Sequence, residues 1–307
     1  MSARHTKDTK KNSRSFLWRL LPSVIVLLAL GWLCSLLFSH NRTNVPVSAK
    51  QLTVLTYNTK QMGMYAKPTQ NRVIRYLQNT DADIVCLQEV DVYKNDKYLT
   101  LPELKQALSK YRYTYFDFKI YNSRRQYGIA VFSKYPLINK TTIRYNSRGN
   151  ISDYCDIVVG MDTFRLFNNH LESNRLVVQD LPDTLETHSI KESAHRISDK
   201  LESARAIRKE QVKAVRSEID KSPYPVIVVG DFNAIPLSYT YLKMRGRDLR
   251  DCFLQSSFGK YGATFSKYHF GIRIDYILCS KLFHPIETVI DHVNYSDHYP
   301  MMTTVTW

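Results

Sequence analysis

Short apolar segments recur along this chain, and several of them run directly into a polar side chain. The clearest occupy residues 52–57, 84–87, 226–229, 274–278 and 301–305. Apolar runs of about four to eight residues that are rich in β-branched side chains predict buried strands. We expect further strands at residues 113–118, 129–132, 157–159 and 163–168. A chain with this many short strands must fold around one or more β-sheets.

Segments with helical spacing lie between these strands. Apolar residues recur at helical intervals within residues 72–77, 102–108 and 190–219, which predicts amphipathic helices. Short strands with helices between them favour an α/β fold in which two sheets pack face to face and the helices lie outside. The polar stretch 176–200 interrupts this order, and it is either a surface insertion or a lid beside a substrate site.

Basic residues outnumber acidic ones and are unevenly distributed. The formal net charge is +15, and residues 1–50 contain eight Lys and Arg residues but one acidic residue. The remaining chain holds 35 basic and 27 acidic residues. This balance favours an anionic partner such as nucleic acid, phospholipid or a phosphorylated metabolite, although a solvated basic surface explains the charge equally well. With 44% hydrophobic residues, the chain has enough apolar surface for a sizeable core.

Residues 20–38 form a stretch of nineteen residues without a charge. At a rise of about 1.5 Å per residue, a helix of this length just crosses a hydrocarbon core of about 30 Å. Six basic residues precede the stretch and two follow it closely. The positive-inside rule therefore predicts a cytoplasmic N-terminus and a main domain on the other side of the membrane.

We therefore expect a basic cytoplasmic tail at residues 1–19, a single-pass transmembrane helix or signal anchor at 20–38, a polar linker at 39–50 and one large domain at 51–307. A cleaved signal peptide and a buried core helix are the alternatives. The sequence Phe38-Ser39-His40 lacks the small residues of a cleavage site, which disfavours the first. The uniformly apolar stretch beside a basic tail disfavours the second.

The polar residues near the predicted strands are of the kinds that bind hard cations. Carboxylate and amide oxygens come from Asn58, Glu89, Asp231, Asn233, Asp275 and Asp297. Such donors suit Mg²⁺, Mn²⁺ or Ca²⁺ rather than Zn²⁺, and the five cysteines show no zinc-type spacing. His170 and His298 add groups that hydrogen-bond phosphates and transfer protons near neutral pH. Each residue alone is more often a turn or cap residue, so the hypothesis rests on the whole set.

Six short motifs carry these residues in a fixed order. They are Tyr57-Asn58, Gln88-Glu89, Asn169-His170-Leu171, Gly230-Asp231-Phe232-Asn233, Ile274-Asp275-Tyr276 and Ser296-Asp297-His298. This set, spread over residues 51–307, resembles the endonuclease/exonuclease/phosphatase superfamily, which includes pancreatic-type deoxyribonucleases, abasic-site endonucleases, neutral sphingomyelinases and inositol-polyphosphate 5-phosphatases. The resemblance implies a four-layered α/β sandwich. In such a sandwich, two packed, mainly antiparallel sheets are flanked by helices, and a metal site lies at one edge of the sheets.

The resemblance also implies roles for individual residues. Glu89 is the expected principal ligand of a divalent cation, assisted by Asn58 and Asp297. The cation is expected to be Mg²⁺, with Mn²⁺ or Ca²⁺ as alternatives. Asp231 is expected to orient or deprotonate the attacking water, and Asn233 to hold a phosphate oxygen.

Two imidazoles complete the implied site. His298 is expected to contact the phosphate, with Asp275 orienting it through the other ring nitrogen, and His170 to be a second phosphate-binding imidazole. An anionic pocket for a cation, beside imidazole and amide groups for the substrate's oxygens, suits hydrolysis of a phosphate ester.

Two positions depart from the abasic-site endonuclease pattern. Those enzymes have an Asp two residues after the Asn, where this chain has Lys60. They place a phosphate-contacting Tyr two residues before the glycine that is Gly128 here; this chain has Gln126 at that position, and Tyr127 is shifted by one. These departures disfavour abasic-site repair, and Tyr127 is not among the expected site residues.

The sequence therefore predicts a divalent-metal-dependent phosphoesterase that cleaves phosphodiester bonds by water attack. One hypothesis is an extracytoplasmic endonuclease, supported by the basic domain and the pair Arg124-Arg125. The alternative is a lipid-headgroup (sphingomyelinase-like) phosphodiesterase or an inositol-phosphate phosphatase, because the predicted anchor would hold the site near a bilayer. A third is a binding protein that has kept the fold, which the complete polar set disfavours. No obligate protein partner is indicated.

Overall fold

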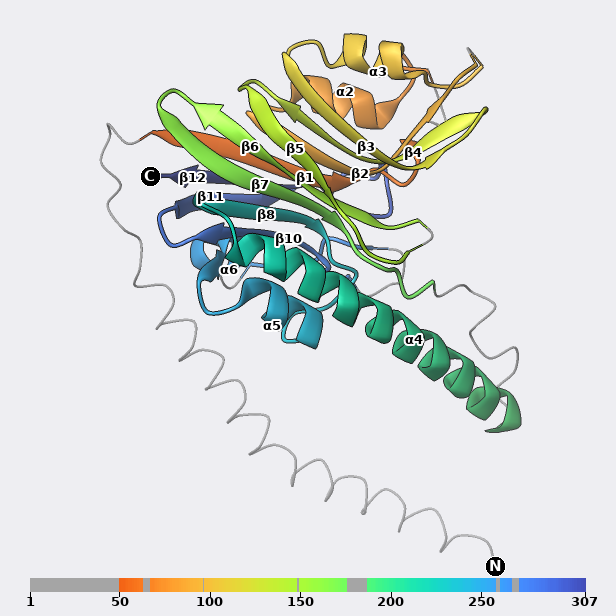
Figure 1. Ribbon diagram of the computed structural model, residues 1–307. Helices are drawn as coiled ribbons and strands as arrows, with labels where there is room; N and C mark the ends of the chain where they lie inside the picture. Colours follow the sequence, from red (N-terminus) through yellow and green to blue (C-terminus); the bar gives the residue numbers. More distant parts are fainter. Residues whose placement is uncertain are drawn as a thin grey trace, which may run out of the picture. The chain divides into compact units, whose positions relative to one another are not determined.

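The computed structural model of the protein describes residues 50–307 except 63–66, 96, 148, 176–186, 258–259 and 267–270. Two six-stranded sheets form within this part of the chain (Figure 1). The first has the strand order β11-β12-β1-β2-β4-β3, and the second has the order β5-β6-β7-β8-β10-β9.

The strand bounds are as follows. The first sheet contains β1 (Gln51–Asn58), β2 (Ile84–Tyr93), β3 (Tyr113–Tyr121), β4 (Arg125–Ser133), β11 (His284–Ile290) and β12 (Met301–Thr306). The second sheet contains β5 (Leu137–Ile143), β6 (Ile151–Val159), β7 (Asp162–His170), β8 (Val226–Asp231), β9 (Leu249–Asp251) and β10 (Asp275–Ser280).

Each sheet has one parallel pair of strands at its centre. In the first sheet β1 runs parallel to β2, and in the second β7 runs parallel to β8, while the other pairings are antiparallel. The carboxyl ends of β1, β7 and β8 carry Asn58, His170 and Asp231. The two sheets are therefore mixed, and each brings the polar ends of its central strands to one edge.

The side chains of β1 show how one apolar strand serves two layers. Leu52 and Val54 join the cluster between the sheets, which also contains Phe164 and Ile227 from the second sheet. Leu55 and Tyr57 point the other way, into a cluster with the outer helices. Successive side chains of a strand face opposite sides, so a strand buried on both faces is apolar at nearly every position.

Helices cover the outer face of each sheet. They are α2 (Arg72–Asn79), α3 (Leu101–Ala107), α4 (Thr187–Asp220) and α5 (Tyr239–Arg245). The short helix α6 (Cys252–Ser256) instead contributes Cys252 to the cluster between the sheets. Helices α2 and α3 pack on the first sheet through residues such as Ile74 and Leu104. Helices α4 and α5 pack on the second through residues such as Val215 and Met244. The order helix, sheet, sheet, helix is the four-layered sandwich that the resemblance implies.

The predicted strands and helices are present, and most are longer than predicted. Strands β5, β9 and β11 and helices α5 and α6 were not predicted from the sequence. Not every polar site residue near a predicted strand ends that strand. Glu89 lies inside β2, and Asp275 begins β10. Strand β10 is antiparallel to β8, so the start of β10 lies beside the end of β8, and Asp275 pairs with Asp231.

Part of the predicted organisation lies outside the described residues. This applies to the tail 1–19, the membrane segment 20–38 and the linker up to residue 49. Among the described residues, none of the helices combines the length and apolar character needed to cross a membrane. Of the polar stretch 176–200, residues 187–200 form the start of α4. The four described cysteines, Cys86, Cys155, Cys252 and Cys279, are buried and free.

Candidate active site

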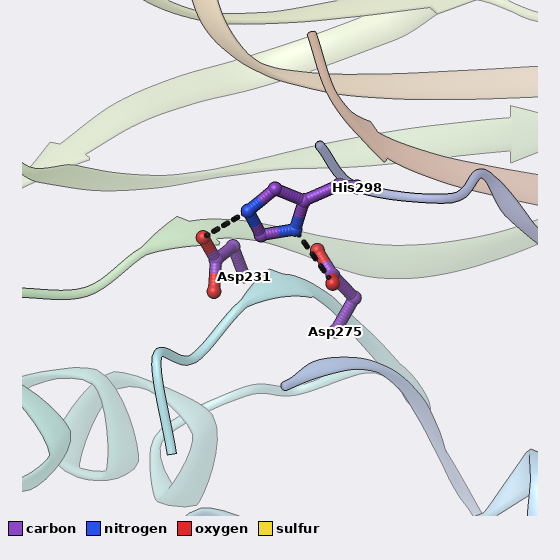
Figure 2. Close-up of side chains that lie close together, drawn as sticks. All are labelled: Asp231, Asp275 and His298. Atoms are coloured by element: carbon purple, nitrogen blue, oxygen red, sulfur yellow. Dashed lines mark hydrogen bonds and ion pairs between the residues drawn. The ribbon is translucent and has the colours of Figure 1, made fainter. Parts of the chain in front are cut away.

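A buried imidazole lies between two carboxylates at the polar edge of the sandwich. Figure 2 shows the His298 ring with Asp275 on one side and Asp231 on the other. The Nδ1 atom of His298 hydrogen-bonds with Asp275 Oδ2 at 2.9 Å, and Nε2 lies 3.7 Å from Asp231 Oδ2. The loop before β12 holds His298 in place, because Ser296 Oγ accepts the His298 N–H and donates to the carbonyl of Asn58 at the end of β1.

The charges of this group follow from its burial and pairing. Burial opposes the charged form of His298, but Asp275 and Asp231 outweigh it and raise the pKa of His298 to about 10. Burial raises the pKa of Asp231 to about 6, although His298 acts in the opposite direction. At neutral pH the group therefore contains an imidazolium between two carboxylates.

Asp231 is held by amide groups from two elements. Its carboxylate accepts hydrogen bonds from Asn58 Nδ2 at 3.0 Å, from the Asn233 N–H at 2.8 Å and from Asn233 Nδ2 at 3.1 Å. Gly230 is required before it, because its φ is +127° and a Cβ would lie 2.0 Å from the Asn169 carbonyl oxygen. The Gly-Asp-Phe-Asn motif thus combines a close approach of β7 and β8 with a fixed carboxylate.

Glu89 projects from a bulge in β2. The pairing of β2 with β4 shifts register between Leu87 and Val90, and Glu89 takes a φ of +53°. A bulge re-aims a side chain within a strand, which is why Glu89 reaches the site from the strand interior. Its Oε1 accepts a hydrogen bond of 3.3 Å from Asn58 Nδ2. Burial raises the pKa of Glu89, and the Asn58 hydrogen bond and His298 act in the opposite direction.

His170 approaches the same carboxylates from the end of β7. Its Nε2 lies 3.7 Å from Glu89 Oε1 and 4.0 Å from Asp231 Oδ2. Burial lowers the pKa of His170, and Asp231 acts in the opposite direction. Asp297, whose carboxylate also influences the pKa of Glu89, pairs through Oδ2 with Lys60 Nζ at 3.1 Å. All eight residues predicted for the site thus converge at this edge of the sandwich.

A family model decides the classification of this chain. The model of the endonuclease/exonuclease/phosphatase family matches residues 55–298. The chain belongs to the endonuclease/exonuclease/phosphatase family. Membership makes it an enzyme that hydrolyses phosphoester bonds. A search of the curated proteins gave no match.

Solved structures share the fold of this family member. An endonuclease/exonuclease/phosphatase from Beutenbergia cavernae DSM 12333 is 17% identical with a TM-score of 0.62, covering 84% of this chain and 72% of its own. A family protein from Leptotrichia buccalis C-1013-b is 15% identical with a TM-score of 0.59, covering 83% and 100%. Truncated Caenorhabditis elegans TDP2 is 18% identical with a TM-score of 0.59, covering 84% and 98%. At these identities the likeness shows the fold alone.

Two residues of α4 that the sequence analysis missed support the segment after His170. Arg208 Nη1 donates to the Glu172 carbonyl at 2.6 Å, and Gln211 Oε1 accepts the Glu172 N–H at 2.8 Å. Both side chains are buried, with exposed fractions of 4% and 1%. The sequence signal for this role was the position of an Arg and a Gln, three residues apart, on the apolar face of a helix that is otherwise charged. These contacts fix the backbone that carries His170.

Tyr127 also lies near the site, although it was not among the predicted residues. It is buried on β4. Burial and then the carboxylate of Glu89 raise its pKa, so its hydroxyl stays protonated. Although Tyr127 is shifted by one residue from the abasic-site endonuclease pattern, a tyrosine therefore still lies near the site.

Two groups of side chains in this family member offer ligand atoms for a cation. Asp231, Asp275 and His298 have ligand atoms within 4.8 Å of one another. However, a metal at His298 Nε2 would have to displace the proton of a ring that Asp275 and Asp231 keep charged at neutral pH. Asn58, Glu89 and Asp297 offer oxygen donors only. Glu89 fits a cation best, because it is a largely buried carboxylate whose pKa burial raises, and a bound cation would offset that cost.

Proposed function

We propose that this enzyme is a divalent-metal-dependent phosphodiesterase that uses water as the nucleophile. The observation that carries the proposal is the buried Asp275–His298–Asp231 array beside the separate oxygen set at Glu89. One group provides acid–base and phosphate-binding chemistry, and the other provides ligands for a hard cation. A phosphodiester needs both, because water must lose a proton while negative charge builds on the phosphate.

Glu89, Asn58 and Asp297 are the residues that would hold the cation. Asn58 Oδ1 accepts the Lys60 N–H at 3.1 Å and has a second lone pair for a metal. Oxygen donors of this kind suit Mg²⁺, with Mn²⁺ or Ca²⁺ as alternatives. A divalent cation bound there would polarise a phosphoryl oxygen and stabilise the leaving alkoxide.

Asp231 is the residue that would accept the proton of the attacking water. Its pKa of about 6 makes it a carboxylate at neutral pH and a base matched to that pH. Asn58 and Asn233 hold the carboxylate by hydrogen bonds, so it needs no reorganisation. Asn233 is the residue that would hold a phosphate oxygen through its amide.

His298 would donate from Nε2 to a non-bridging phosphate oxygen, because its Nδ1–H is engaged by Asp275. The pKa of about 10 keeps the ring charged, and therefore a strong donor, through neutral pH. His170 is neutral at that pH and would act as a second hydrogen-bond donor to the phosphate.

An extracytoplasmic endonuclease is the first substrate hypothesis. The described domain is basic. Arg124 is exposed in the turn between β3 and β4, and Arg125 is the first residue of β4. Phosphate contacts from Lys and Arg supply much of the affinity for nucleic acid. The extracytoplasmic location depends on the predicted membrane segment at residues 20–38 and is part of the proposal.

A lipid-headgroup phosphodiesterase is the second candidate, and exposed apolar side chains favour it. Ile235, Leu237, Tyr239 and Leu242 follow Asn233 closely, and their exposed fractions are 54%, 78%, 50% and 44%. Lys209 lies 5.9 Å from the Tyr239 ring. Apolar side chains beside basic ones are typical of a surface that meets an anionic bilayer.

A substrate panel tests both candidates. The purified full-length chain in detergent is assayed with Mg²⁺ on plasmid DNA, on sphingomyelin and phosphatidylinositol vesicles, and on soluble inositol phosphates. We expect turnover of one class, and its loss in Glu89→Ala and His298→Ala. Near-full activity of either variant would contradict the assignment of the site. Absence of turnover on every substrate, with each of Mg²⁺, Mn²⁺ and Ca²⁺, would contradict the function.

A further inference from the structure

A lysine occupies a strained loop next to the expected metal ligands. Lys60 and Gln61 have φ values of +47° and +56°, which is uncommon for two consecutive residues other than glycine. Hydrogen bonds hold this conformation, since the Lys60 N–H donates to Asn58 Oδ1 and the Gln61 N–H donates to the Glu89 carbonyl. The loop therefore takes its shape from the backbone and side chains of the site itself.

The loop directs the Lys60 ammonium to a carboxylate of the site. Its Nζ lies 3.1 Å from Asp297 Oδ2, and the side chains of the two residues are 48% and 18% exposed. The electrostatic influence of Lys60 also extends to Glu89. The ammonium thus lies near two of the three expected metal ligands, on a side chain that is half exposed to solvent.

The position of this ammonium limits what else can bind there. Lys60 contacts two of the three expected metal ligands, since its N–H donates to Asn58 Oδ1 and its Nζ lies 3.1 Å from Asp297 Oδ2. A divalent ion that binds Asp297 must displace the ammonium, and a second divalent ion would have to lie beside both positive charges.

We propose that Lys60 is a resident cation of the active site, which limits the site to one divalent ion and contacts a phosphate oxygen of the substrate. The inference rests on the proposed metal-dependent function and deepens it. Once Asp297 binds a divalent ion, its carboxylate no longer holds the ammonium, and the two cations repel each other. The flexible stem lets Nζ swing outward, where an anionic phosphate is the nearest partner for it.

This role predicts opposite effects of one substitution on two ligands. Lys60→Met removes the repulsion, so Mn²⁺ should bind roughly fivefold more tightly, as expected of a partly screened charge pair. The same change removes a phosphate contact, so inorganic phosphate should bind the Mn²⁺-loaded protein roughly fivefold more weakly. A residue that only shaped the loop would weaken both. Lys60→Arg keeps the charge and should keep both affinities near wild type.

Titration calorimetry on the full-length chain in detergent measures both affinities. Mn²⁺ is titrated first, and inorganic phosphate is then titrated into the Mn²⁺-loaded protein. We expect one Mn²⁺ per wild-type chain, and loss of that binding in Glu89→Gln shows that the heat comes from this site. Lys134→Met is a matched control, because Lys134 pairs with Asp83 at 2.9 Å and has an exposed side-chain fraction of 40%. Asp83 precedes β2 at the end away from the site, so this control should change neither affinity.

Two outcomes would overturn the proposal about Lys60 alone. One is two Mn²⁺ ions bound per wild-type chain. The other is a Lys60→Met variant that binds Mn²⁺ no more tightly, or phosphate no more weakly, than wild type does. Failure of the wild-type chain to bind Mn²⁺ would overturn the metal-dependent function together with it, so the two failures are distinguishable.

Discussion

His170 and His298 lie in one site and are equally buried, yet their charges differ. Their exposed fractions are 4% and 5%. His298 has a carboxylate at 2.9 Å, and its pKa is raised to about 10. The carboxylates nearest to His170 are at 3.7 and 4.0 Å, and burial lowers its pKa. Burial alone favours the neutral ring, so the distance to a carboxylate decides which histidine is charged.

Removing each ring tests this comparison most directly. We expect His298→Ala to lower kcat/KM by about 10⁴-fold, because a charged donor to the phosphate is lost. His170→Ala should lower it by about 10²-fold, because it removes a neutral donor. Steady-state kinetics on the substrate found in the panel measure both. Equal losses would mean that the difference in charge has no catalytic consequence.

Removing the carboxylate behind His298 makes the two histidines alike. Asp275→Asn should lower the pKa of His298 from about 10, since Asp275 is the strongest of the groups that raise it. We expect kcat/KM to fall by about 10²- to 10³-fold at neutral pH and the loss to shrink at lower pH, where the ring regains its proton. NMR titration of His298 and a pH profile test this. An unchanged pKa would contradict the assignment.

Removing a hydrogen bond that supports the segment after His170 tests whether His170 and His298 are held in place independently. Arg208→Met removes the hydrogen bond to the Glu172 carbonyl. We expect Tm to fall by about 5 °C and kcat to fall by about 10-fold, with little change in the pKa of His298. Arg205 is exposed on the same helix, so Arg205→Met is the control and should change neither quantity. A large fall in the pKa of His298 would show that the two histidines are not supported independently.

Asp153, a buried carboxyl group away from the site, shows how burial and a neighbouring charge change the pKa of an acid. Burial, and then the carboxylate of Asp117, raise the pKa of Asp153 well above its usual range. A raised pKa in the folded state means that the free energy of unfolding is highest below the unfolded value of about 3.9 and falls as pH rises towards the folded one. The Tm of Asp153→Asn minus the Tm of wild type should therefore increase by a few degrees when the pH is raised from 5 to 8. Thermal melts at both values measure it, and a pH-independent difference would contradict the raised pKa.

Much of the site could be predicted from sequence because its motifs are local. The Gly-Asp-Phe-Asn segment brings Asp231 and Asn233 together within three residues, and Asp297 and His298 are neighbours. Other features depend on pairing between distant strands. The bulge that turns Glu89 towards the site exists only against β4. The support of Glu172 by Arg208 and Gln211 joins residues more than thirty positions apart. The local pattern places these two side chains on the buried face of a helix, but it does not indicate which residue they support.

The sequence by itself determined the types of residue in the site, their order and the alternation of strands and helices, because side-chain chemistry and hydrophobic periodicity are properties of short segments. The tertiary structure decided which strands run parallel, that Asp275 faces Asp231 across β10 and β8, and that Lys60 reaches Asp297. It also decided that His298 is charged and His170 neutral. These outcomes depend on distances between segments far apart in the chain, and such distances are set only when the two sheets pack.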